Sequence, residues 1–93
     1  MKNQRFSSVW DAIEDTPEEA ENMKLRSVLM TALGNHLVRA DMSQAQAAKL
    51  FGVTQPRISD LMRGKIHLFA LDALVNMASA AGLRIEMTVL ESA

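Results

Sequence analysis

The most constraining feature of the sequence is the stretch from Gln44 to Arg63, in which two short segments flank a glycine. Counting from Gln44, Ala48 comes four residues on, Gly52 eight on, Ile58 fourteen on and Leu61 seventeen on. A small residue at Ala48 lets two helices approach closely, and Gly52 can take the left-handed conformation that turns the chain sharply. Because Ile58 and Leu61 would pack the second helix back onto the first, this spacing predicts a helix-turn-helix over residues 44–63.

Capping signals and apolar periodicity predict the other helices. Thr16 followed by Pro17, with Glu19 three residues after Thr16, is typical of a helix N-terminus with a capping box, and apolar spacing continues to about Ala40. Ser43 with Gln46 has the same capping-box spacing. Thr54 is the expected cap of the helix that contains Pro56 in its first turn. Two further helices are expected, a short amphipathic one at residues 8–14 and one over 68–81 that Gly82 ends, which makes five helices in all.

The C-terminal residues follow a different pattern. From Leu83 to Val89 the sequence alternates apolar and polar residues with a period of two, which predicts a half-buried strand. A strand needs a second strand for its backbone hydrogen bonds, and this chain offers no obvious one. Two alternatives are open: the same segment of a second copy, which makes 83–93 a dimerisation element, or residues 5–9 of the same or another chain.

Composition limits the classes of function. A chain of 93 residues buries only about 60–65% of the surface that it exposes when unfolded, which favours one domain with a modest core and a partner subunit. With no cysteine and two histidines, neither a disulfide framework nor a zinc site is expected. The sequence contains neither an apolar run of about 20 residues nor a signal peptide, so we expect a soluble, cytoplasmic protein with no membrane partner.

The net charge of −1 is a sum over segments of opposite sign. Residues 11–23 carry −6, whereas residues 43–67 carry +3 because their only acid is Asp60. The basic members of the second segment are Lys49, Arg57, Arg63 and Lys65. Near-neutrality of the whole chain therefore does not exclude a nucleic-acid partner, although a charge block is also compatible with a merely solvated face.

The stretches from Ser43 to Ala48 and from Gly52 to Leu61, with Gly64, resemble the Cro/repressor-type (XRE) family of DNA-binding proteins. The resemblance implies a mainly α, five-helix, repressor-like fold with a helix-turn-helix domain at 16–82 that binds a palindromic operator as a homodimer. The amphipathic segment at 1–15 supplies the first helix, and the C-terminal strand follows the domain. Residues 8–20, 23–26 and 71–75 resemble a subgroup that includes antitoxins of the HigA type. That subgroup implies a repressor of its own operon that neutralises a RelE-like toxin. A phage-derived or stand-alone regulator is the alternative; no catalytic cluster, cofactor or metal site is expected.

The first turn of the second helix is expected to meet base edges in the major groove. Gln55 can bond adenine and Arg57 can bond guanine, each in a bidentate manner. Pro56 and Ser59 share the outward face, and Ser59 or Thr54 can reach a phosphate. The resemblance places Gln44 on the DNA backbone, where the helix dipole also favours phosphate, and Arg63 and Lys65 add attraction for phosphates.

Other interpretations of these residues are open. Gln44 and Gln55 could be merely solvated, and Arg57 could pair with Asp60 at the three-residue spacing on one helix. Asp60 is discordant because a carboxylate on the outward face repels phosphate. We expect it to form a salt bridge with Arg57 or Arg63 rather than to accept a hydrogen bond from cytosine.

Overall fold

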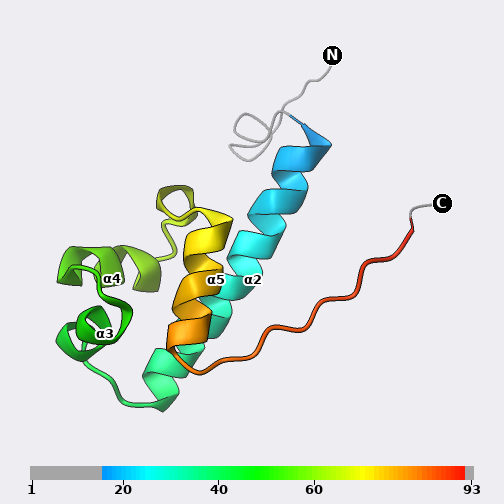
Figure 1. The fold of residues 1–93 in the computed structure, drawn as a ribbon. Helices are drawn as coiled ribbons and strands as arrows, with labels where there is room; N and C mark the ends of the chain where they lie inside the picture. Colours follow the sequence, from blue (N-terminus) through cyan, green and yellow to red (C-terminus); the bar gives the residue numbers. More distant parts are fainter. Residues whose placement is uncertain (1–15, 92–93) are drawn as a thin grey trace.

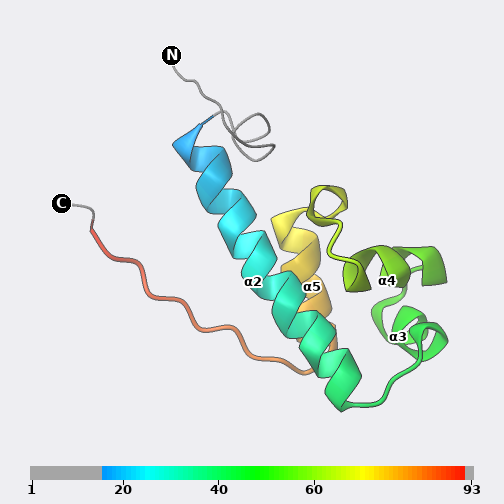
Figure 2. The ribbon, with the colours of Figure 1, turned by 180° about the vertical axis from the view of Figure 1, so that it is seen from behind.

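The computed structural model describes residues 16–91, and its helices form a bundle around one long helix (Figures 1 and 2). The elements are α2 (Pro17–Arg39), α3 (Gln44–Phe51), α4 (Gln55–Met62), the 3-10 turn η1 (Ile66–Leu68) and α5 (Leu71–Ala80). Helix α5 packs along α2, and the α3–α4 pair packs against one end of these two helices (Figure 1). Among the described residues, no helix has the length and apolarity needed to cross a membrane.

The helix boundaries follow from local hydrogen bonding. The Thr16 hydroxyl accepts a bond from the Glu19 N–H (3.1 Å) at the start of α2. At the start of α3, the Ser43 hydroxyl accepts from the Gln46 N–H (3.0 Å), and the Gln46 side chain accepts from the Ser43 N–H (2.9 Å), which confirms the capping box. Gly52 ends α3 with φ +68°, the left-handed conformation that the sequence predicts there.

The core lies where α2, α4 and α5 meet. Its fully buried large side chains are Leu33, Ile58, Phe69 and Leu74. Ala47 and Ala48 of α3 are buried and belong to the same core. Removing these side chains from water is the main stabilising contribution, since burial of one large apolar side chain contributes about 1.5–3 kcal/mol. Met62 and Val75, although apolar, are 39% and 40% exposed and lie outside this core.

The predicted fold class is wrong in two respects. Residues 16–91 form four α-helices and no strand, so a five-helix domain with a C-terminal β-strand is not what the chain forms. The amphipathic segment expected at 8–14 falls outside the described residues, and the helix expected to begin at Leu68 begins at Leu71, after η1. Residues 83–91 run along the α2 side of the bundle without helix or strand (Figure 2). Alternation alone does not make a strand, because the ladder also needs a hydrogen-bonding neighbour, and the described part of the chain supplies none.

Candidate nucleic-acid interface

Helices α3 and α4 place most of the predicted contact residues at the start of a helix. Gln44 is the first residue of α3, and Gln55 and Pro56 are the first two of α4; all three are exposed. Ser59 lies one turn after Gln55 on the same helix and is half-buried. Arg63, the C-cap of α4, is exposed at the other end. The pair thus presents polar side chains and two helix N-termini, where free N–H groups favour an anion.

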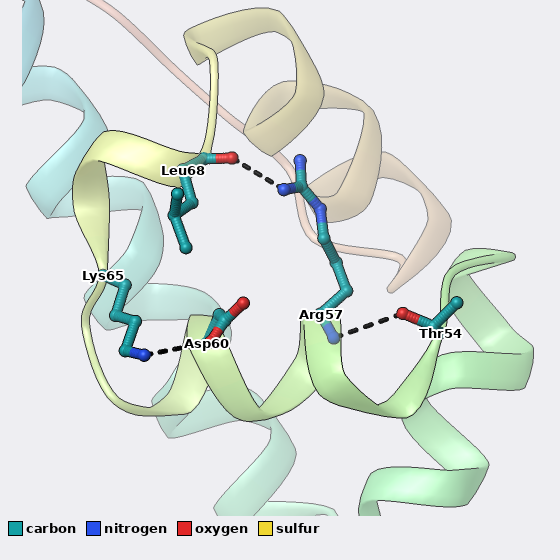
Figure 3. A network of polar contacts seen from close by, with 5 residues as sticks. All are labelled: Thr54, Arg57, Asp60, Lys65 and Leu68. Atoms are coloured by element: carbon teal, nitrogen blue, oxygen red, sulfur yellow. Dashed lines mark hydrogen bonds and ion pairs between the residues drawn. The ribbon is translucent and has the colours of Figure 1, made fainter.

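The Thr54 hydroxyl caps α4 by accepting a hydrogen bond from the Arg57 N–H at 3.3 Å (Figure 3). A hydroxyl has two lone pairs and one proton, so this cap leaves its O–H able to donate to a phosphate. Thr54 is exposed, which makes such a contact geometrically open.

Arg57 differs from its neighbours in the first turn because it is half-buried. Its Nη1 donates a hydrogen bond to the backbone carbonyl oxygen of Leu68 at 2.7 Å, and its guanidinium carbon lies 4.1 Å from the centroid of the Phe69 ring. Figure 3 shows the side chain extending from α4 to the end of η1 rather than towards Asp60. The carbonyl and the ring therefore hold a side chain that the sequence suggested would read a base or pair with Asp60.

Asp60 forms an ion pair with Lys65, which the sequence did not suggest as its partner. Its Oδ1 lies 3.5 Å from Nζ of Lys65, and the Lys65 N–H donates to the backbone carbonyl of Asp60 (3.0 Å) as the chain leaves α4 (Figure 3). The expected salt bridge to Arg57 or Arg63 is not the one that forms. The carboxylate lowers the positive potential around Lys65, while Lys49 and Arg63 remain exposed cations on this part of the surface.

The structure thus separates the predicted residues into two groups. The first group lies exposed on α3 and α4 or beside them, with Ser59 half-buried among them: Gln44, Thr54, Gln55, Pro56, Ser59 and Arg63. The second group, Arg57 and Lys65, is engaged within the chain. Sequence reasoning missed the contacts of Arg57 with the Leu68 backbone carbonyl and the Phe69 ring. Its only signal in the sequence is an arginine in a first turn followed, twelve residues later, by a core phenylalanine, which is too general a pattern to identify a contact.

Comparisons with known proteins agree with this geometry. A family model described as a helix-turn-helix domain matches residues 12–90. No curated protein matches the sequence. A solved structure assigned as an XRE family transcriptional regulator is similar over 80% of this chain and 83% of its own, with a TM-score of 0.72 and 30% sequence identity. The chain therefore belongs to the XRE family of helix-turn-helix proteins.

Proposed function

We propose that the protein is a sequence-specific DNA-binding transcriptional repressor that reads its operator with the first turn of α4. The observation that carries this proposal is the α3–Gly52–α4 unit with Gln55 exposed at the start of α4. Helices of this type enter the major groove by their N-terminal residues, and a glutamine there can form two hydrogen bonds with adenine. Pro56 contacts the groove wall or a thymine methyl group, and Ser59 donates to a base or a phosphate one turn later.

The sequence-independent part of the affinity comes from phosphate contacts. Gln44 and the N-terminus of α3 hold one phosphate, and the Thr54 hydroxyl and Arg63 hold others. Lys65 contributes less than Arg63 because the Asp60 carboxylate lies beside its ammonium group. With so few cations per subunit, nonspecific binding is weak, and base contacts supply most of the operator affinity.

Selection of bound duplexes from a random DNA pool tests the function and identifies the operator. Gln55→Ala should then lower operator affinity by about 1–3 kcal/mol and flatten the preference at one base pair, because it removes a bidentate contact. Asn76→Ala removes an exposed amide from α5 and is the matched control; it should leave affinity and preference unchanged. The proposed function is wrong if the wild-type protein selects no sequence from the pool.

A homodimer fits both the palindromic operator and the surface of the C-terminal segment. Ile85, Met87, Val89 and Leu90 are 40%, 65%, 85% and 81% exposed, which is unusual for four large apolar side chains so close in sequence. Arg84 and Glu86 lie on either side of Ile85, so the segment is self-complementary in charge when two copies meet in opposite directions around a two-fold axis. A second copy is therefore the proposed occupant of this surface.

Light scattering on the full chain and on a chain ending at Arg84 tests the dimer. The shorter chain keeps Leu83, whose N–H donates to the Ala78 carbonyl (2.9 Å) and whose side chain packs on the core, so the bundle should still fold. We expect a dimer for the full chain and a monomer for the shorter one. A dimer that survives the truncation would exclude residues 85–93 as the contact.

The proposed partner beyond DNA is a basic, RelE-like toxin, which makes the protein an antitoxin that represses its own operon. Glu18, Glu19 and Glu21 are exposed at the start of α2, at the end of that helix remote from α3 and α4 (Figure 1). Operator and a basic protein could therefore be held at the same time. Changing the three glutamates to glutamine should weaken capture of the toxin encoded beside this gene without weakening operator binding. If the neighbouring reading frames encode no toxin, the alternative of a stand-alone regulator holds.

A further inference from the structure

We propose that Arg57 is a positioning residue, which holds the first turn of α4 against the end of η1 and the Phe69 ring and so sets the direction in which Gln55 meets DNA. This inference rests on the proposed DNA-binding function. It assigns to Arg57 a role other than base reading and makes Phe69 part of the DNA-binding apparatus, although Phe69 is fully buried.

Two contacts of different kinds hold the guanidinium. The 2.7 Å hydrogen bond from Nη1 to the Leu68 carbonyl is charge-assisted, and such bonds are shorter and stronger than neutral ones. The 4.1 Å approach of the guanidinium to the Phe69 ring is within the range of a cation–π interaction. Arginine can make both at once because its planar group can stack on a ring while its edge donates hydrogen bonds.

The positions of the Leu68 carbonyl and the Phe69 ring explain why the contacts of Arg57 orient α4. Phe69 has no exposed surface, so the packing of the core fixes the ring. Leu68 ends η1, three residues before α5 begins at Leu71 (Figure 3). Ile58 and Leu61 fix the inner face of α4 against the core, and Arg57 adds a lateral contact at its first turn, where Gln55 lies. An eight-residue helix is only about 12 Å long, so a change in tilt moves its first turn relative to a base pair.

Base reading and positioning by Arg57 predict different measurements. A guanidinium that reads guanine would leave both the carbonyl and the ring, and its removal would abolish a preference for guanine at one position. A guanidinium that positions α4 stays on the ring in the complex. Removal of the guanidinium then lowers operator affinity without changing which base is preferred. Removal of the Phe69 ring also lowers the affinity without changing the preferred base.

The first experiment compares Arg57→Ala, Phe69→Leu and the double variant on the operator selected by the wild-type protein. We expect Arg57→Ala to bind about tenfold more weakly, and Phe69→Leu, which keeps the hydrogen bond to the Leu68 carbonyl, to lose less, both with the same preferred base at every position. The double variant should bind no more weakly than Arg57→Ala, because that change already removes the ring contact that Phe69→Leu breaks. Arg63→Ala is the matched control for lost charge: it should reduce the salt dependence by about one phosphate contact per subunit, whereas Arg57→Ala should leave the salt dependence unchanged.

The second experiment does not depend on a variant that folds. In the NMR spectrum of the wild-type protein, the Arg57 side-chain signals should carry a ring-current shift from Phe69, and the shift should persist when operator is added. Loss of the shift on adding operator, or loss of one guanine preference in Arg57→Ala, would overturn the proposal in favour of base reading. If the wild-type protein selects no DNA, the positioning role falls together with the proposed function, whereas the ring-current shift of the free protein still reports whether the contact forms.

Discussion

At the scale of single residues, two glycines show which local features are readable from a sequence. Gly52 has φ +68°, and the sequence predicted its turn from its position between two periodic segments. Gly34 lies inside α2, which continues through it. Beyond the local backbone, an added Cβ would meet no atom within 4 Å at either glycine, so backbone conformation alone separates the two positions.

We therefore expect opposite effects from the same substitution. Gly52→Ala should destabilise the protein by about 1–2 kcal/mol, because the left-handed conformation brings a Cβ too close to the following carbonyl oxygen. Gly34→Ala should stabilise it by about 0.5–1 kcal/mol, because glycine in a helix loses more conformational freedom on folding than alanine does. Urea unfolding followed by circular dichroism measures both, and equal effects would show that φ at position 52 is not constrained.

The contacts of Arg57 and Lys65 were beyond sequence reasoning for a physical reason. Both side chains are long, and several partners lie within their reach. The three-residue spacing of Arg57 and Asp60 on one helix suggested an ion pair, but a carbonyl and a ring that follow α4 hold the guanidinium. Their positions depend on how η1 and Phe69 pack, which local spacing does not encode.

At the scale of elements, the sequence predicts helix starts well because a cap depends on three or four adjacent residues. Thr16, Ser43 and Thr54 all act as the predicted N-caps. The strand predicted at residues 83–89 failed because a strand depends on a neighbour that local sequence cannot supply. The alternation there still marks a real property, since Ile85, Met87 and Val89 are exposed apolar side chains.

Ser43 offers a test of the α3 cap. Ser43→Ala should lower the free energy of unfolding by about 1 kcal/mol, because it removes the acceptor of the Gln46 N–H at the first turn of α3. Ser27→Ala, at an exposed position inside α2, is the matched control and should be neutral or slightly stabilising, since alanine is the better helix former. If thermal or urea unfolding gives the same value for both variants, the capping box contributes nothing to stability.

At the scale of the whole molecule, charged and apolar surfaces occupy different places. The acidic residues of α2 begin the long helix, the α3–α4 pair lies towards its other end, and the exposed apolar segment leaves the bundle after α5 (Figures 1 and 2). A net charge of −1 therefore gives little information on binding, because the contributions are separated in space. Separation of the apolar segment from α4 also leaves both recognition helices of the proposed dimer accessible.

A dimer joined through the segment that follows Arg84 should require one spacing of operator half-sites. Two rigidly related recognition helices reach successive major grooves about 34 Å apart, which is one turn of about 10 base pairs. Insertion of about five base pairs between the half-sites rotates one of them to the opposite side of the duplex, so affinity should fall to that of a single half-site.

Met87→Glu, which places a charge on the proposed dimer contact, should cause the same loss on the unaltered operator. Thr88→Glu adds the same charge at the next position of the alternating segment and should not. Fluorescence anisotropy with labelled duplexes measures all four cases, and an affinity independent of spacing would mean that the subunits bind as independent monomers.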